Sequence, residues 1–533
     1  MGAPPSGGVA RCLAMPAAPD LLTLVQSAAE RLGEAPFLAA GDQVVTGCEF
    51  QNRVEHAASG LLAAGFRPGD RLAVLLHRCV EESVAILAAA AAGGIAVPIH
   101  GKLRQDQVAH ILADCAPFAV VTSALRALAL RDPARLLQGQ RVWSVGEELG
   151  LPAAPFAALD GKGPLPAPAG EAPAVLLYTS GSTGLPKGVV QSQHNLALGA
   201  GIVAGYLGLD ATDHLLAVLP FSFDYGLNQL LSALQAGCRI TAAEPLGAGE
   251  LAHLFTRLRP TGLAGVPSLW HEVATGLQSG TLTAAHGASL RRVTNSGGTL
   301  RAADARQLRR HWPHTRVFAM YGLTEAFRSA YLEPAEFDEF PDSFGRALPG
   351  VELLLVSPET GQVLSGPATG ELVHAGALVA QGYWQRPADT ALRFRPDPRG
   401  GGGTVVYSGD IVRRDEAGRH YFVSRSDRLL KVMGHRVSPD EVAAAVAGMP
   451  GVGEVAVYGL DGGADGHRIV LAVQGDPADA SLVGSVQRRC RMQLPSYMVP
   501  AIIKILAALP HNQNGKVDEA ALRARFGPCT GDT

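Results

Sequence analysis

The sequence has few cysteines and few charged residues, and neither kind is clustered. Its seven cysteines are scattered singly through 533 residues, without a CxxC pair or a Cys/His pair at metal-ligand spacing. This pattern argues against a cysteine metal site and favours reduced thiols in a cytoplasmic protein. The 45 Lys and Arg residues nearly balance the 48 Asp and Glu residues, so the formal charge is −3. No long run of one sign is present, so a small molecule is expected as partner rather than nucleic acid or an anionic membrane surface.

Long uninterrupted hydrophobic runs are also missing. The most apolar stretch, residues 83–99, is 17 residues long and is broken by Gly93 and Gly94. It predicts a buried helix leading into a strand rather than a membrane span. Residues 1–19 lack the continuous apolar core of a secretory signal and are expected to form a disordered tail, with Met15 as an alternative start to Met1.

Hydrophobic residues make up 47% of the chain and charged residues 17%, a balance typical of a globular α/β protein. Apolar strand-like runs alternate with longer helical patterns, which predicts mainly parallel sheets covered on both faces. The runs are residues 72–76, 119–123, 174–178, 215–220 and 316–320. A Pro/Ala/Gly-rich stretch, residues 152–173, is expected to be a surface loop.

The sequence thus predicts an α/β fold with a large multi-layer N-terminal domain and a small mobile α+β C-terminal domain. The expected divisions are a tail at residues 1–19, a large domain at 20–426 and a small domain at 427–533. The small domain is expected to contain a helix near residues 439–449 and a strand near residues 454–458, and its boundary is placed at a hinge, Asp427.

The segment YTSGSTGLPKGVV, residues 178–190, places an apolar strand before a loop of glycine and hydroxyl residues with one lysine. Glycines let a backbone approach anionic oxygens, hydroxyl groups donate hydrogen bonds, and Lys187 adds positive charge. The loop does not fit the Walker A pattern. An ordinary flexible turn is the alternative, but so long a specific string favours a polyphosphate-binding loop.

This segment resembles the phosphate loop of the adenylate-forming (AMP-binding) superfamily of acyl-CoA synthetases, amino-acid adenylation domains and luciferases. The resemblance extends over about residues 20–526, with the motifs in the family's order. It implies ATP- and Mg²⁺-dependent activation of a carboxylic acid as an acyl or aminoacyl adenylate, with release of pyrophosphate. It further implies transfer to the thiol of CoA or of a separate phosphopantetheinyl carrier protein.

Two further motifs are assigned nucleotide roles by this resemblance. In YGLTE, Tyr321 would pack on adenine, Thr324 would contact the α-phosphate and Glu325 would hold Mg²⁺. In VVYSGD, Asp410 would accept the ribose hydroxyls, and Arg425 would lie near the ribose. The expected ATP/AMP-binding residues are Thr179, Ser180, Gly181, Ser182, Thr183, Gly184, Lys187, Tyr321, Gly322, Thr324, Asp410 and Arg425. Ser408 and Ser424 depart from the usual family residues.

The C-terminal motifs carry the remaining expected roles. Lys516, in LPHNQNGKVD, matches the family's catalytic lysine, which stabilises the oxygens that become more negative during attack. Asp427 would be the pivot of a domain rotation, and Lys431 and Gly434 are candidates for the thiol step. Thr324, Glu325, Lys187 and Lys516 are the expected catalytic residues. Because the chain ends soon after Lys516, a free-standing enzyme is expected.

The identity of the acid depends on Asp224, which stands where amino-acid-activating members carry the aspartate that pairs with the substrate ammonium. Arg328 should line the same pocket and either neutralise Asp224 or bind a second carboxylate on the substrate. The other expected wall residues are Tyr225, Asn228, Gly265, Asn295 and Ser329. We expect a small polar acid or an amino acid; a plain medium- or long-chain acyl substrate is the alternative.

A non-catalytic nucleotide-binding protein, a luciferase-like oxygenase and a phosphoryl-transferring ATPase are the rival functions. The presence of Glu325, Asp410 and Lys516 together argues against the first, and release of pyrophosphate with AMP, rather than phosphate with ADP, would exclude the ATPase. The sequence indicates no oligomeric state.

Overall fold

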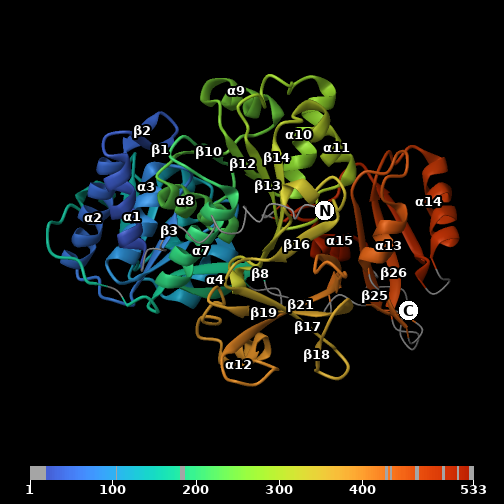
Figure 1. Ribbon diagram of the computed structural model, residues 1–533. Coiled ribbons are helices and arrows are strands. Elements are labelled where there is room, and N and C mark those ends of the chain that lie inside the picture. The colour runs from blue at the N-terminus through green and yellow to red at the C-terminus, as the bar shows by residue number, and fades with distance from the viewer. Residues whose placement is uncertain are drawn as a thin grey trace, which may run out of the picture. The chain divides into compact units, whose positions relative to one another are not determined.

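The computed structural model shows an α/β chain (Figure 1). It describes residues 20–103, 105–167, 169–180, 186–425, 430–432, 435–437, 439–461, 467–494, 498–512 and 515–526. Contacts divide the chain into a first unit, residues 1–353 with 374–406, and a second unit, residues 354–373 with 407–533. Among the described residues, no helix combines the length and the hydrophobicity needed to cross a bilayer.

The first unit contains a seven-stranded sheet in the order β7-β6-β5-β3-β4-β8-β9. Its strands are β3 (Arg71–Leu75), β4 (Ile95–Pro98), β5 (Ala119–Ser123), β6 (Val142–Val145), β7 (Ala154–Pro155), β8 (Pro173–Ser180) and β9 (Pro186–Ser192). All neighbours are parallel except β8 and β9, which form an antiparallel hairpin. The three strand predictions in this region are confirmed.

Helices accompany this sheet, namely α2 (Gly47–Ala63), α3 (Val80–Ala91), α4 (Gln105–Cys115), α5 (Ala124–Leu128) and α6 (Pro133–Leu136). Helix α3 is buried along most of its length and leads into β4, as expected for residues 83–99. The Pro/Ala/Gly-rich stretch, residues 152–173, is largely exposed, with Phe156 and Leu159 as its buried anchors.

A second sheet of the first unit contains the strands β16-β15-β14-β13-β12-β10-β11-β1-β2 in that order. These are β1 (Pro36–Ala40), β2 (Gln43–Thr46), β10 (His214–Ala217), β11 (Arg239–Ala242), β12 (Gly262–Gly265), β13 (Arg292–Asn295), β14 (Arg316–Tyr321), β15 (Ala330–Tyr331) and β16 (Ser343–Ala347). The strands from β1 through β11, β10, β12 and β13 to β14 are parallel. The carboxyl ends of these strands therefore share one edge, where open α/β sheets bind ligands.

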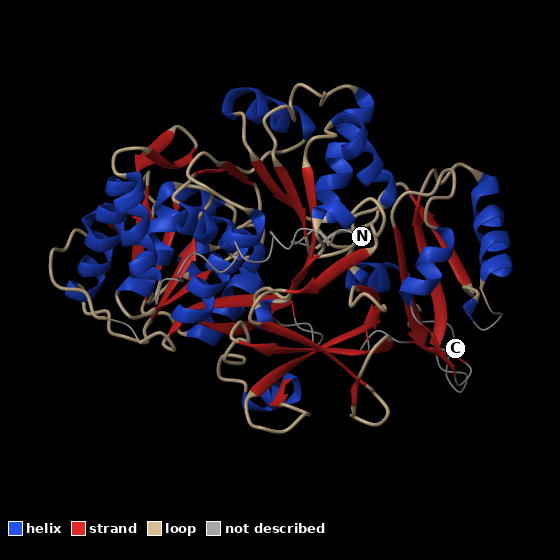
Figure 2. Cartoon of the chain, viewed as in Figure 1, coloured by secondary structure: helices blue, strands red, loops and turns tan. Residues whose placement is uncertain are grey.

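Helices cover both faces of this second sheet (Figure 2). The helices are α1 (Leu21–Leu32), α7 (Gln193–Leu207), α8 (Asp224–Ala236), α9 (Ala248–Leu258), α10 (Pro267–Ser279) and α11 (Ala302–His311). Along β10, Leu215 and Ala217 belong to the core that contains α1, α7 and α8, whereas Leu216 belongs to the core of α9 and α10. This alternation is what a sheet buried on both faces requires.

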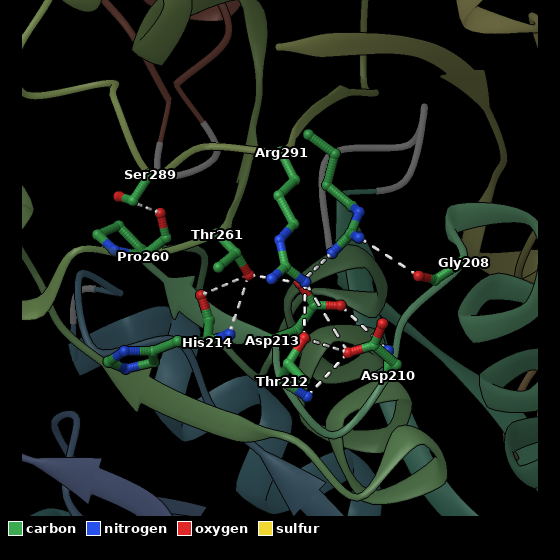
Figure 3. A network of polar contacts seen from close by, with 10 residues as sticks. Gly208, Asp210, Thr212, Asp213, His214, Pro260, Thr261, Ser289 and Arg291 are labelled. Atoms are coloured by element: carbon green, nitrogen blue, oxygen red, sulfur yellow. Dashed lines mark hydrogen bonds and ion pairs between the residues drawn. The ribbon is translucent and has the colours of Figure 1, made fainter. Parts of the chain in front are cut away.

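A buried polar network connects the amino ends of β10, β12 and β13 (Figure 3). The side chain of Asp213 is fully buried, accepts a hydrogen bond from Thr261 Oγ1 at 2.6 Å, and lies 2.7 Å from Arg292 Nη1. Arg291 Nη1 also reaches Asp213 Oδ1, at 3.3 Å. Burial lowers the pKa of the adjacent His214 to about 4, so it is neutral at pH 7. This network stabilises the sheet edge opposite the strand ends that carry the predicted motifs.

The second unit contains β18 (Val363–Leu364), β22 (His420–Arg425) and parts of β17 (Val351–Val356), β19 (Ala368–Gly376) and β21 (Thr404–Arg414). Its C-terminal part has a three-stranded sheet, β25 (Val455–Asp461), β26 (His467–Gln474) and β27 (Ile502–Leu506), and a hairpin, β23 (Leu430–Val432) with β24 (His435–Val437). Its helices are α13 (Pro439–Val446), α14 (Ala480–Gln493) and α15 (Glu519–Phe526). The predicted small α+β region is confirmed; the hinge at Asp427 lies outside the described residues, so the domain boundary stays a prediction.

Candidate active site

The YGLTE motif forms the turn that follows β14, as predicted. A short 3-10 helix, η2 (Thr324–Ala326), begins there. Thr324 is buried, and its carbonyl oxygen accepts a hydrogen bond from Gln191 Nε2 at 2.5 Å. The carbonyl oxygen of Glu325 accepts from the backbone N–H of Ala380 at 2.8 Å. The turn is therefore fixed by hydrogen bonds on both sides, which positions the Thr324 and Glu325 side chains.

Glu325 and Lys187 both contact Tyr383. Tyr383 donates its hydroxyl proton to Glu325 Oε1 at 2.6 Å. Lys187 Nζ lies 5.7 Å from the centre of the Tyr383 ring and forms an ion pair with Asp389 Oδ1 at 2.9 Å. Burial and the neighbouring Glu325 carboxylate raise the pKa of Tyr383, so the phenol stays protonated and donates. Two predicted catalytic residues thus share a contact with one side chain, that of Tyr383.

The predicted phosphate-binding segment contributes residues to both strands of the β8–β9 hairpin. Thr179 is the cross-strand partner of Lys187, and Ser180 is the partner of Pro186. The neighbouring Tyr178 donates a hydrogen bond to Asp114 Oδ2 at 2.7 Å. Four predicted loop residues, Gly181, Ser182, Thr183 and Gly184, lie outside the described residues, so their roles stay predictions.

Tyr321, at the end of β14, lies in a group of stacked rings. Its ring centre is 4.5 Å from that of Phe344 and 5.8 Å from that of His374, with interplanar angles of 25° and 7°. At Gly322, a Cβ would lie 3.3 Å from Arg328 Nη1 and from the carbonyl oxygen of Phe327. The turn is packed closely enough to favour glycine at this position.

Asp224 and Arg328 form a buried ion pair. Arg328 Nη1 lies 3.1 Å from Asp224 Oδ2, and the two side chains are 3% and 4% exposed. Asp224 is the first residue of α8, and Thr324 Oγ1 donates a long hydrogen bond of 3.5 Å to its Oδ1. Before Arg328, the chain passes through Phe327 at a φ of 42°, an uncommon backbone conformation for a residue other than glycine. Of the two roles left open for Arg328, neutralisation of Asp224 is the one seen here.

Two of the other predicted wall residues, Tyr225 and Asn228, line one cavity together with Arg328. Tyr225 forms a hydrogen bond with Thr294 Oγ1, and Arg328 lies over the Tyr225 ring at 4.9 Å. Asn228 Oδ1 accepts from Ser232 Oγ at 3.0 Å. Burial raises the pKa of Tyr225, which is therefore a neutral phenol. These contacts produce a polar wall along the first two turns of α8.

The remaining three predicted wall residues are at the strand ends. Asn295 Nδ2 donates to the carbonyl oxygen of Gly298 at 2.8 Å, and Ser329 is fully buried. At Gly265, a Cβ would lie 2.8 Å from the indole of Trp270, so the glycine is required by the packing of β12 against α10.

Asp410 and Arg425 meet within the second unit. They are cross-strand partners on β21 and β22, and Arg425 Nη1 lies 3.1 Å from Asp410 Oδ1. Ser408 Oγ donates to the carbonyl oxygen of Leu372 at 2.6 Å and accepts from the Asp410 backbone N–H at 3.0 Å. The serine that departs from the family pattern therefore orients the predicted ribose-binding aspartate.

Lys516 lies in a tight turn of the second unit, and its side chain is exposed. Its backbone N–H donates to Asn512 Oδ1 at 3.1 Å, and its carbonyl oxygen accepts from the Asn512 N–H at 2.7 Å. Lys431 lies on β23, paired in register with Arg436. Asp427 and Gly434 are outside the described residues, and their predicted roles are untested.

Comparison with known proteins assigns the family. The model of the AMP-binding enzyme family matches residues 25–384, and the model of the AMP-binding enzyme C-terminal domain matches residues 441–516. The chain belongs to the AMP-binding enzyme family. This membership, together with ligase relatives, makes it an AMP-forming acid–thiol ligase.

Relatives of this AMP-binding enzyme differ greatly in length. An L-proline–[L-prolyl-carrier protein] ligase of Streptomyces coelicolor is 32% identical over 523 residues, covering 94% of this chain and 96% of that protein. The probable non-canonical nonribosomal peptide synthetase CymA of Salinispora arenicola is also 32% identical, but the chain spans only 6% of its length. Among solved structures, ATP-bound MatB from Rhodopseudomonas palustris has a TM-score of 0.84 at 26% identity, covering 95% of this chain and 99% of that one.

Three residues near the AMP-binding motifs were missed by the sequence reasoning: Gln191, Tyr383 and Asp389. The last two belong to the segment GYWQRPADT, residues 382–390. There Gly382 has a φ of 118° and a Cβ would lie 2.7 Å from Thr390 Cγ2, which marks a constrained loop. The sequence signal that could have indicated Tyr383 and Asp389 was a glycine–aromatic pair followed by a charged stretch that contains proline.

Proposed function

We propose that this enzyme activates a small polar carboxylic acid with ATP and Mg²⁺, releases pyrophosphate, and transfers the acyl group to a thiol. One observation carries the proposal. Thr324 contacts Asp224 of the polar pocket, while the next residue, Glu325, contacts Tyr383 beside Lys187. Two consecutive residues of one turn, Thr324 and Glu325, thus connect the proposed acid-binding residue Asp224 with the proposed phosphate-binding residue Lys187.

In the proposed reaction, a substrate carboxylate oxygen attacks the α-phosphorus of ATP, and pyrophosphate leaves. Lys187 and the phosphate-loop hydroxyls hold the phosphates, and Thr324 donates a hydrogen bond to the α-phosphate. Catalysis is then mostly positioning and stabilisation of developing negative charge. Lys516 supplies further positive charge during attack.

Glu325 is the residue proposed to hold Mg²⁺. Its carboxylate is a hard oxygen ligand held in place by Tyr383, which suits a cation that prefers oxygen and few protein ligands. In the part of the chain that the structure describes, no group of three or more His, Cys, Asp or Glu residues could hold a metal. The proposed Mg²⁺ site therefore uses a single protein carboxylate, that of Glu325, together with the phosphate oxygens of ATP. When bound, Mg²⁺ would offset the charge of the phosphate oxygens.

The nucleoside is assigned to two other groups of residues. Tyr321, within its stack of rings, is proposed to pack on adenine, with Gly322 allowing close approach. Asp410, oriented by Ser408 and paired with Arg425, is proposed to accept hydrogen bonds from the ribose. Asp427 is the proposed hinge, and Lys431 and Gly434 are proposed for the thiol step.

The acyl acceptor is proposed to be CoA or a separate carrier protein. The Streptomyces relative is named for a carrier protein, which supports the second choice. A plain long-chain acyl substrate, the alternative, is less well supported because the pocket wall carries Arg328, Asn228 and Ser232 among its apolar residues. A buried polar wall against a hydrocarbon would leave its hydrogen-bonding groups unsatisfied.

The assignment of Lys516 can be tested by separating the two half-reactions. Lys516→Ala should lower acid-dependent ATP–pyrophosphate exchange by at least about 100-fold, because it removes a charge needed in the transition state. Thioester formation from supplied acyl adenylate should stay near the wild-type rate. Lys504→Ala, at another exposed lysine of the second unit, is the matched control and should change neither reaction. Equal loss of both half-reactions in Lys516→Ala would refute the role.

A further inference from the structure

A small internal cavity adjoins the Asp224–Arg328 pair. It has a volume of about 40 Å³ and lies between α7, α8 and the strands β10, β12, β13 and β14. Its polar lining comprises Tyr225, Asn228, Gln229, Ser232, Arg292, Thr294 and Arg328, and the other lining residues are apolar. A water needs roughly 10–15 Å³ of such space, so the cavity has room for about three or four waters or a group of similar size.

The buried side-chain nitrogen and oxygen atoms of this lining that lack a hydrogen-bond partner in the described part of the chain are all N–H donors. Four buried side chains of the lining have N–H groups without a hydrogen-bond partner among the residues that the structure describes: Arg328 through Nε and Nη2, Asn228 through Nδ2, Gln229 through Nε2 and Arg292 through Nε. The acceptor of Asn228, its Oδ1, is already bonded to Ser232. Buried donors of this kind are normally paired, so the cavity is suited to a group that brings acceptor oxygens.

The charges of the lining are already balanced. Arg328 is paired with Asp224 at 3.1 Å, and Arg292 is paired with Asp213 at 2.7 Å. A neutral oxygen can therefore accept hydrogen bonds from Arg328 Nη2 while the ion pair stays intact. A substrate ammonium at Asp224 would instead leave the Arg328 charge without its partner, which is costly for a buried cation.

We propose that the preferred acid has no α-ammonium and ends in a neutral acceptor oxygen, a carbonyl or amide, that enters this cavity and accepts from Arg328 and Asn228. This inference rests on the proposed function and names its substrate class. An α-amino acid would be accepted only with a side-chain carboxylate, because that carboxylate would compensate Arg328 when the ammonium occupies Asp224. Plain hydrocarbon tails would leave the donors unsatisfied.

The test uses the full-length enzyme and matched acids in ATP–pyrophosphate exchange. Terminal mono-amides of four- to six-carbon dicarboxylic acids are compared with isosteres in which the amide is replaced by an isopropyl group. Leucine is compared with aspartate and glutamate. We expect kcat/KM to be at least about tenfold higher for the best amide than for its isostere, and higher for the acidic amino acids than for leucine, because sites built to hydrogen-bond a substrate reject analogues that lack the group.

A variant pair tests the cavity itself. Asn228→Leu replaces a donor by an apolar group of similar size and should reduce the amide-to-isostere ratio. Gln235→Met, at a buried residue of α8 outside the cavity lining, should leave the ratio unchanged. The ratio in the unmodified enzyme decides the question if Asn228→Leu does not fold.

The outcomes separate the two claims. Equal kcat/KM for amides and isosteres, or a preference for leucine over the acidic amino acids, would overturn the inference while the exchange itself supports the proposed function. Exchange with none of these acids, nor with fatty acids or other amino acids, would refute the proposed function and the inference with it.

Discussion

Tyr383 is a single residue on which two charged groups of the proposed site depend. Its hydroxyl holds Glu325 at 2.6 Å, and its ring lies 5.7 Å from Lys187 Nζ. A hydrogen bond to a charged group contributes about 1.5–3 kcal/mol. The position of the Glu325 carboxylate, and with it the proposed Mg²⁺ site, should therefore depend on one phenol.

Tyr383→Phe should lower kcat/KM for acid-dependent pyrophosphate exchange by about 10- to 100-fold, the equivalent of that hydrogen bond. The loss should be largest at low Mg²⁺ concentration, because a less well-positioned carboxylate binds the cation more weakly. Measuring exchange across a Mg²⁺ titration checks both statements. Tyr331→Phe is the control, since the Tyr331 hydroxyl donates to Glu333 at the surface. Identical behaviour of the two variants would show that Tyr383 has no special role.

At the scale of residues, the sequence predicted which residues form the site but not how they pair with one another. Asp224 and Arg328 were both predicted to line the pocket, yet their partnership could not be decided because they are 104 positions apart. The positive φ of Phe327 helps aim Arg328, and no local pattern around Phe327 indicated it. Tyr383 was missed because its hydrogen bond to Glu325 exists only after the chain has folded.

Helix α8 carries the polar wall, and its position depends on close packing at its first turn. Gly226 is the third residue of the helix, and a Cβ there would lie 1.9 Å from the carbonyl oxygen of Pro220. That oxygen belongs to a backbone that cannot easily move aside. The glycine therefore lets the loop before α8 approach the helix and sets the direction of Asp224 and Tyr225.

Gly226→Ala should destabilise the protein by about 1–3 kcal/mol or more, because a methyl group would overlap a backbone atom. It should also reduce pyrophosphate exchange by displacing Asp224. Urea unfolding followed by tryptophan fluorescence, together with the exchange assay, measures both effects. Gly249→Ala, in α9, is the control; a Cβ there meets nothing within 4 Å, so stability should stay equal or rise by up to about 1 kcal/mol. A Gly226→Ala protein as stable and active as wild type would contradict this account of α8.

At the scale of elements, the hydrophobic runs predicted where strands occur, but they did not predict at which residue a strand ends. The run at residues 215–220 predicted a strand as long as itself, whereas β10 ends at Ala217. Leu219 and Phe221 are buried although they belong to the connection to α8, so the hydrophobic pattern continues past the strand. Burial rather than strand pairing explains the extra apolar residues.

The whole molecule divides its motifs between two units. Lys187, the YGLTE turn and the Asp224–Arg328 pair belong to the first unit, while Asp410, Arg425 and Lys516 belong to the second. The order of the motifs allowed the family and the two-part organisation to be predicted. The sequence did not predict that residues 354–373 group with the C-terminal part of the chain, because this grouping depends on contacts in the folded chain and not on chain order.

The central claim is that one acid oxygen becomes bonded to the α-phosphorus of ATP. In the most direct test, the enzyme is incubated with ATP, Mg²⁺, an accepted thiol and an accepted acid substrate whose carboxylate is labelled with ¹⁸O. The products are then analysed by mass spectrometry. The account predicts pyrophosphate together with AMP that carries one ¹⁸O from the acid in its phosphate. Label in inorganic phosphate with release of ADP, or AMP formed without label, would contradict it.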